Sequence, residues 1–183
     1  MTTLADGITG ELHVLIGEPM SDCWRVTNMQ IFEFGPQHKF VNRKGEEVEG
    51  SDLTLHLQCR WRIVDSARIL FGRDDLLHPA DENIPLDEFD WDKDYSVLDV
   101  VQREWFAERR TAPLRVVDAI GDIYGGFQIS LEQHVVLQAF PCDSDRGEYS
   151  EHWRLFGHRS DGSHFVITGY GIEEDSHESP TDR

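Results

Sequence analysis

The sequence predicts an α+β fold that is mainly antiparallel β, a curved sheet or sandwich with one substantial helix packed on it. Three observations predict this class. Apolar residues alternate through 53–64, which is typical of a half-buried strand. An amphipathic helical stripe occupies 96–110. The last third of the chain holds short apolar runs joined by short turns, and such links require antiparallel pairing.

A short helix is predicted near the start of the chain. Residues 1–7 show no pattern, so we expect a loose end there. Apolar residues recur at helical spacing through 8–16, where Thr9 can cap the helix and Gly17 ends it. The alternative for 12–16 is a strand.

Extended chain is predicted next, from 20 to 34. Aromatic and β-branched residues are frequent in this stretch, and Gly35 stops it. Lys44-Gly45 then lies between two short apolar segments, which predicts a small exposed hairpin.

The strand at 53–64 carries the strongest pattern in the chain. Its apolar face consists of Leu53, Leu55, Leu57, Cys59, Trp61 and Ile63. Its polar face consists of His56, Gln58, Arg60 and Arg62. Residues 68–71 are expected to extend the same sheet.

An acidic segment follows at 74–94, where nine of the acidic residues gather. Pro79 and Pro85 interrupt it and no periodicity is sustained, so we expect a long loop. Several apolar residues are scattered through the segment, which indicates that the core holds it at intervals.

The helix at 96–110 has the signals of a complete helix. Ser96 and Asp99 form a capping pair, and arginines occupy its last turn, where the helix dipole favours cations. Its predicted buried stripe is Val97, Leu98, Val101 and Trp105, with Phe106 beside it. The two strongest apolar faces must cover each other, so we expect burial of Leu57, Trp61, Val101 and Trp105.

The remaining chain is predicted to be strand-rich. The expected strands are 114–120, 127–131, 135–140, 152–156 and 164–168. Gly125-Gly126 and Asp161-Gly162 are predicted hairpin turns. Residues 173–183 are polar and are expected to form a second loose end, within a single domain of 1–183.

Charge and composition narrow the classes of function. The 183-residue chain has 35 acidic and 17 basic residues, a net charge of −18, which repels nucleic acid and anionic lipid surfaces. No apolar run is long enough to cross a membrane, and no secretory signal precedes the first element. Three widely separated cysteines indicate a reducing cytoplasm.

The sequence contains no specific metal or cofactor motif, so we expect no cofactor and no stoichiometric metal. Three of the nine histidines, His152, His158 and His164, can converge only if neighbouring strands bring them together. Asp90, Asp92 and Asp94 alternate as in a calcium loop, but the glycine of an EF-hand turn does not follow.

Nucleophilic catalysis has little support in the sequence. Cys59 lies on the apolar face of its strand, where a thiol is inert, and Cys142 has no base beside it. No GxSxG sequence or phosphate-binding glycine loop is present.

Three arginines on predicted strands form a candidate anion site. Arg60 and Arg62 share the polar face of 53–64, and Arg154 lies within 152–156. Guanidinium groups on rigid strands can hold a carboxylate or a phosphate. The alternative is that these arginines pair with acids across strands.

Two segments, 55–63 and 151–156 followed by 164–166, resemble parts of a family of small uncharacterised bacterial cytoplasmic proteins. The resemblance implies a bacterial cytoplasmic origin. It supplies no activity and no site residues.

We therefore predict a non-enzymatic acidic interaction protein, an inhibitor or immunity-type binder of a basic partner. The sequence specifies neither the partner nor an oligomeric state. The predicted contact residues are Asp87, Glu88, Phe89, Asp90, Trp91, Asp92 and Asp94. Rings surrounded by carboxylates suit a partner surface. The competing interpretation is that Phe89 and Trp91 only pin the loop to the core.

The alternative function is a small-molecule or anion binder, or a hydrolase, with a pocket near Arg60, Arg62 and Arg154. A convergent pocket with perturbed titratable groups would favour this alternative. A flat acidic face with exposed aromatic rings would favour the interaction protein.

Overall fold

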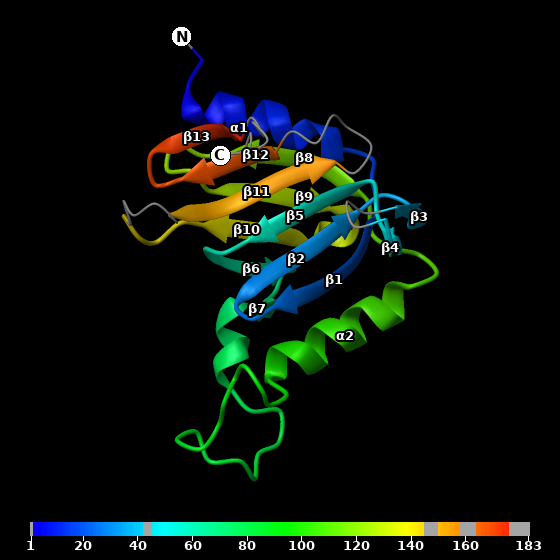
Figure 1. Ribbon diagram of the computed structural model, residues 1–183, viewed down its shortest axis with the longest axis vertical. Coiled ribbons are helices and arrows are strands. Elements are labelled where there is room, and N and C mark those ends of the chain that lie inside the picture. Colours follow the sequence, from blue (N-terminus) through cyan, green and yellow to red (C-terminus); the bar gives the residue numbers. More distant parts are fainter. Residues whose placement is uncertain (1, 42–44, 145–149, 158–163, 176–183) are drawn as a thin grey trace.

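The computed structural model describes residues 2–41, 45–144, 150–157 and 164–175, and it has two main antiparallel sheets with two α-helices at their edges (Figure 1). The six-stranded sheet has the order β1 (Met20–Val26), β2 (Met29–Phe34), β5 (Leu53–Leu57), β11 (Glu151–Gly157), β12 (His164–Thr168) and β13 (Gly171–Asp175). The five-stranded sheet has the order β7 (Ile69–Gly72), β6 (Arg60–Val64), β10 (Val136–Phe140), β9 (Phe127–Leu131) and β8 (Val116–Gly121).

The remaining elements are short apart from one helix. A separate hairpin is formed by β3 (His38–Val41) and β4 (Glu47–Gly50). The helical segments are α1 (Leu4–Leu12), η1 (His13–Leu15), η2 (Arg73–Leu77), α2 (Val97–Arg109) and η3 (Glu132–His134). The predicted class, α+β and mainly antiparallel with one substantial helix, is confirmed. None of these described helices is long and apolar enough to cross a membrane.

The alternating run at 53–64 forms two strands and not one. It breaks at Gln58 and Cys59, whose N–H groups both donate to the carbonyl of His152 at 2.9 and 3.0 Å. The chain turns there from the six-stranded to the five-stranded sheet. The apolar residues still face inward on both sides of the break, because the alternation continues through it.

The core lies between the two sheets and is rich in aromatic rings. Phe32 of β2 meets Trp61 of β6 edge to face at a centroid distance of 5.2 Å. Phe127 of β9 meets Trp153 of β11 in the same way at 5.0 Å. Such pairs join the sheets through both buried area and ring electrostatics.

Helix α2 covers the edge of the two sheets where β1 and β7 lie (Figure 1). Ser96 and Asp99 form the predicted capping box, with reciprocal bonds of 3.2 and 3.0 Å between side chain and backbone. Burial of Leu57, Trp61 and Trp105 is confirmed, whereas Val101 is only half-buried. The buried face of α2 carries Gln102 beside the apolar side chains, because it meets polar residues of β1 and β2.

Helix α1 begins earlier than predicted. Thr3 caps it by accepting a hydrogen bond from the Asp6 N–H at 3.1 Å, so residues 4–7 are helical and not a loose end. A 3-10 turn and not a strand occupies 13–15. The helix packs on β8, where a Cβ at Gly121 would lie 2.4 Å from Ile8 Cγ2. Only glycine at position 121 lets the two elements approach this closely.

Turns divide the predicted extended segments. Thr27, with φ of 51°, splits 20–34 into the hairpin of β1 and β2. The pairing of β3 with β4 confirms the first predicted hairpin, of which Lys44 lies outside the described residues, and the pairing of β8 with β9 confirms the turn at Gly125-Gly126. Asp161-Gly162 lies outside the described residues. Strand β13 extends through Asp175, so the expected loose end from 173 is wrong for 173–175.

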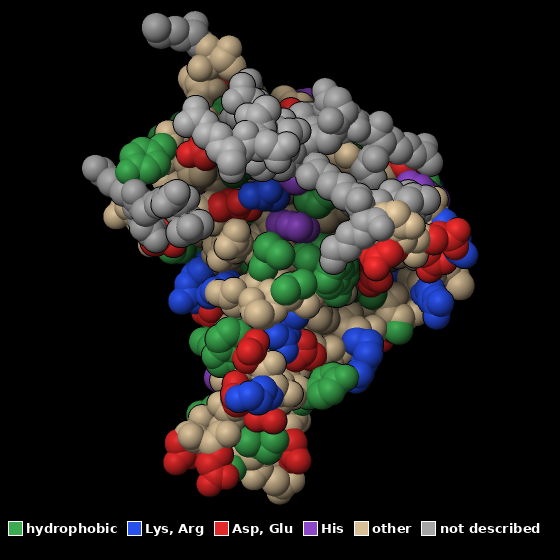
Figure 2. Space-filling view, viewed as in Figure 1, with side chains coloured by type: hydrophobic (Ala, Val, Ile, Leu, Met, Phe, Trp, Pro, Cys, Tyr) green, Lys and Arg blue, Asp and Glu red, His purple; other side chains and the backbone are tan. Residues whose placement is uncertain are grey.

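The acidic segment begins with η2 and then forms a loop that projects from the body (Figure 1). Leu76 is buried and Trp91 packs against the core, so the segment is held near both of its ends. Leu86, between them, is 67% exposed. Figure 2 shows acidic side chains around apolar ones on this projection.

Replacing Trp61 by alanine should lower the free energy of unfolding by about 3–5 kcal/mol, because the indole contacts both Phe32 and Phe71 in the core. Urea unfolding followed by circular dichroism measures the change. Tyr124→Ala is the control, since this exposed ring should change stability by no more than about 0.5 kcal/mol. Equal losses in the two variants would contradict the core assignment.

Candidate functional site

A cavity of about 430 Å³ lies where the end of the acidic segment meets β1 and the start of α2. We call it the acidic cavity. It is lined by Trp24, Arg25, Thr27, Asp92, Lys93, Asp94, Tyr95, Asp99 and Gln102. The lining therefore joins two predicted contact residues to side chains that lie about seventy positions earlier in the chain.

One ion pair holds the walls of the acidic cavity together. Arg25 of β1 donates to both carboxylate oxygens of Asp99 in α2, at 2.7 and 2.9 Å. Its Nη2 also donates to the carbonyl of Trp91 at 3.2 Å. Partial burial acts to raise the pKa of Asp99, but hydrogen bonds from Arg25 and Ser96 hold it below its ordinary value. Asp99 is therefore ionised at neutral pH and neutralises Arg25.

Asp90 organises the loop beside the cavity. Its carboxylate pairs with Lys93 and accepts a hydrogen bond from the Asp92 N–H at 3.2 Å. Both bonds lower the pKa of Asp90, and the bond from Lys93 has the larger effect. The Asp90 N–H in turn donates to Asp94 Oδ2 at 3.0 Å. Asp92 and Asp94 form no direct ion pair in the described part of the chain, although the pKa of Lys93 is raised by its hydrogen bond to Asp90 and further by their charges.

Two aromatic rings complete the cavity. The side chains of Trp24 and Tyr95 are large apolar groups that remain 45% and 66% exposed. The Trp24 indole N–H donates to Glu33 Oε1 at 3.3 Å, which orients the ring. Arg103 Cζ lies 5.8 Å from the centre of the Tyr95 ring, so this ring already contacts one guanidinium. Exposed rings beside carboxylates that form no direct ion pair among the described residues favour an ammonium or guanidinium group.

The other predicted contact residues do not line this cavity. Asp87 and Glu88 are exposed on the projecting part of the loop. Phe89 and Trp91 are half-buried, and Trp91 packs against the core, as the pinning interpretation requires. The exposed aromatic residues at the acidic cavity are therefore Trp24 and Tyr95, and not the predicted Phe89 and Trp91.

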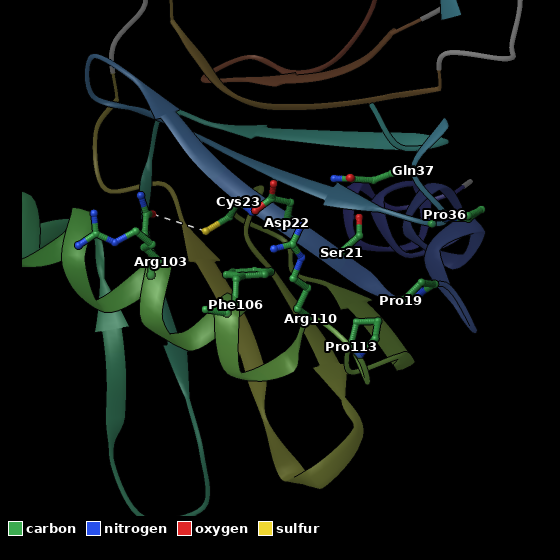
Figure 3. A pocket seen from close by; sticks show the side chains of 13 residues that line it. Pro19, Ser21, Asp22, Cys23, Pro36, Gln37, Arg103, Phe106, Arg110 and Pro113 are labelled. Carbon is green, nitrogen blue, oxygen red and sulfur yellow. Dashed lines mark hydrogen bonds between the residues drawn. The ribbon is translucent and has the colours of Figure 1, made fainter. Parts of the chain in front are cut away.

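A second hollow, of about 570 Å³, separates the later half of α2 from β1 (Figure 3). Asp22 of β1 and Arg110 at the end of α2 point toward each other across it, with Phe106 beside them. Gln102 lines both this groove and the acidic cavity. The two hollows are therefore neighbours along the boundary between α2 and β1.

Asp22 is the perturbed carboxyl group of the groove. Burial raises its pKa, and the charge of Glu33 on the neighbouring strand adds to the effect. A hydrogen bond from the Cys23 N–H, 2.8 Å long, opposes the shift, as does Arg110. The thiol of Cys23 donates to Gln102 Oε1 at 3.5 Å. Burial raises the pKa of this thiol well above its ordinary value, so it is a poor nucleophile.

The three arginines predicted as one anion site do not meet. Arg60 pairs with Asp74, and Arg62 Nε donates to Gln138 Oε1 at 2.8 Å, both on the outer face of the five-stranded sheet. Arg154 lies in the six-stranded sheet, where it pairs with Glu151. Sequence alternation placed Arg60 and Arg62 on the polar face of their strand, and Arg154 only within a strand, but could not assign the sheets.

The histidines and remaining cysteines form no site in the described residues. His152 is buried with Nδ1 3.8 Å from Asp143 Oδ1, whereas His164 stacks on Phe156 at 4.5 Å. His158 lies outside the described residues. Within the described part of the chain, no group of three or more metal-binding side chains comes together. Burial raises the pKa of Cys59 to about 12, and Cys142 is exposed.

No family model, curated protein or solved structure matches this chain. The resemblance to small bacterial proteins stays a prediction.

The Asp22→Asn variant should melt at a higher temperature than the parent protein at pH 7. A carboxyl whose folded pKa is raised favours folding only while it is protonated, and this contribution is lost as the pH rises through the folded pKa. The gain should vanish below about pH 3.9, the unfolded pKa of Asp. Thermal melts followed by circular dichroism between pH 3 and 8 test it.

Asp65→Asn is the control of opposite sign. Hydrogen bonds from the N–H groups of Ala67 and Arg68 lower the pKa of Asp65, so this variant should melt lower than the parent at pH 7. A loss of stability at pH 7 in Asp22→Asn would show that Asp22 is a structural carboxylate.

Proposed function

We propose that this protein is a non-enzymatic binding module, which docks a basic protein partner by taking a lysine or arginine side chain into the acidic cavity. The observation that carries the proposal is the combination of Asp92 and Asp94, which form no direct ion pair among the described residues, with the exposed rings of Trp24 and Tyr95. Carboxylates supply charge, and the ring faces bind a cation through their quadrupoles.

The overall charge supports the same kind of partner. A net charge of −18 attracts basic proteins over about one Debye length and accelerates their encounter. The projecting loop adds exposed carboxylates, such as Asp87 and Glu88, around the apolar Leu86. An apolar contact surrounded by charges is typical of a transient protein interface.

The two buried cysteines are poor candidates for a catalytic nucleophile. Cys23 and Cys59 have raised pKa values, so neither supplies a thiolate near neutral pH. The proposal therefore keeps the predicted inhibitor or immunity-type role, acting in the bacterial cytoplasm. Such a factor needs a pre-formed acidic contact surface and no reaction centre.

A labelled peptide of alternating Lys and Gly tests the cavity, with the Gln and Gly counterpart as the uncharged reference. Fluorescence anisotropy at several salt concentrations gives the affinity. The double variant Asp92→Asn, Asp94→Asn should bind the Lys peptide at least about tenfold more weakly, because it removes the charge-assisted contacts to the lysine. A loss of about 1.4 kcal/mol in binding free energy corresponds to a factor of ten.

The matched control is Asp87→Asn, Glu88→Gln. It removes the same charge from exposed positions outside the cavity, so it should weaken binding only slightly and mainly at low salt. Equal weakening by both double variants would mean that net charge alone attracts the peptide. Binding of the Gln peptide as tightly as the Lys peptide would overturn the proposal.

The indole signal of Trp24 locates the bound cation. In a nitrogen-15 NMR titration of the parent protein, the Lys peptide should shift the Trp24 indole N–H more than that of buried Trp153, which donates to the carbonyl of Gly125 at 2.7 Å. A Trp24 signal that does not move at saturation would place the peptide elsewhere.

A further inference from the structure

We infer that the outer face of the five-stranded sheet carries a binding site for a small oxyanion, a carboxylate or a phosphate. A hollow of about 340 Å³ lies there between β6, β7 and the start of η2. We call it the arginine pocket. It is lined by Arg60, Trp61, Arg62, Ile69, Gly72, Arg73, Asp74, Asp75 and Phe140. The site is separate from the acidic cavity and shares no lining residue with it.

The charge balance of the arginine pocket points to an anion. Arg73 is half-buried and makes no hydrogen bond or ion pair with the described residues, and its buried Nε has no acceptor. Arg62 donates to the neutral amide of Gln138. Arg62 and Arg73 thus have no carboxylate partner among the described residues, in a chain with 35 acids and 17 bases. A bound anion would supply the missing acceptors.

The arginines are held in place by the sheet. Arg60 and Arg62 project from the same face of β6, because they are two residues apart in a strand. Arg62 lies with Cζ 5.5 Å from the centre of the Phe140 ring, which orients its guanidinium. Guanidinium groups held in this way can donate two parallel N–H bonds to the paired oxygens of a carboxylate or phosphate.

Gly72 keeps space beside Arg62. It pairs with Arg62 across β6 and β7, and a Cβ at this position would lie 3.0 Å from the Trp61 carbonyl oxygen and 3.1 Å from Arg62 Cβ. A side chain there would push against the strand that carries the arginines. Phe140 and Ile69 add apolar surface for the remainder of an organic anion.

Two carboxylates, Asp74 and Asp75, also line the arginine pocket and oppose the binding of an anion. Asp75 Oδ2 accepts a hydrogen bond from the Gly72 N–H at 2.8 Å, so one of its oxygens is engaged with the backbone. Asp74 pairs with Arg60, and both side chains are exposed. Exposed pairs of this kind contribute little to stability, so a bound anion can replace Asp74 at Arg60. Asp74 is therefore a competitor of the anion.

Isothermal titration calorimetry with inorganic phosphate and with benzoate, at constant ionic strength set by chloride, tests the inference. Arg62→Gln and Arg73→Gln should each weaken binding at least about tenfold. Asp74→Asn should strengthen it several-fold, because it frees Arg60. Arg68→Gln removes the same charge from an exposed turn outside the pocket and should leave the affinity unchanged.

Benzoate and phosphate separate the two kinds of oxyanion. Tighter binding of benzoate would assign an organic carboxylate with its ring on Phe140, and tighter binding of phosphate would assign a phosphate group. Arg73→Lys keeps the charge but loses the paired N–H donors of the guanidinium group, so it should lose part of the affinity. This variant remains informative if Arg73→Gln does not fold.

Three results would overturn the inference. These are no heat with either anion, equal weakening by Arg68→Gln and Arg73→Gln, or weaker binding by Asp74→Asn. Each is independent of the proposed docking function, because Arg73→Gln should leave affinity for the Lys peptide unchanged. Failure of the arginine pocket and failure of the acidic cavity are therefore distinguishable.

Discussion

A chain of four aromatic rings holds the architecture together. Phe32 in the six-stranded sheet contacts Trp61 in the five-stranded sheet, Trp61 contacts Phe71, and Phe71 contacts Trp105 of α2, at centroid distances of 5.2, 6.1 and 5.8 Å. These contacts join both sheets to the helix through one continuous buried cluster. Their burial removes large apolar areas from water, so packing of α2 at this edge of the sheets is favoured.

The position of α2 decides where the polar groups of the candidate site meet. Once Trp105 is seated, Gln102 meets Gln30 at 3.1 Å and Asp99 meets Arg25. The acidic loop enters the helix at Ser96, so its last residues must lie against β1. The apolar core thus sets the geometry of the acidic cavity. The Arg25–Asp99 pair then fixes the position of α2 along β1.

Charge is distributed unevenly over this acidic molecule. The acidic cavity lies at the boundary of β1 and α2, whereas the arginine pocket lies on the outer face of β6 and β7. Solvent screens charges over about 8 Å at physiological salt, so two such sites can keep opposite local preferences. A basic side chain and a small oxyanion would therefore occupy different surfaces of one protein.

Local sequence determined the features that depend on neighbouring residues alone. The capping box of Ser96 and Asp99, the burial alternation through 53–64 and the acidic end of the loop follow from spacing, because each is a short-range interaction or a strict period. Only the tertiary structure decided what meets across the chain. The break at Gln58 needed the His152 carbonyl, Trp24 met Asp92 and Asp94 where β1 packs beside α2, and Arg73 and not Arg154 joined Arg60 and Arg62. Period-two alternation gives the face of a strand but not its sheet, since that depends on pairing between distant segments.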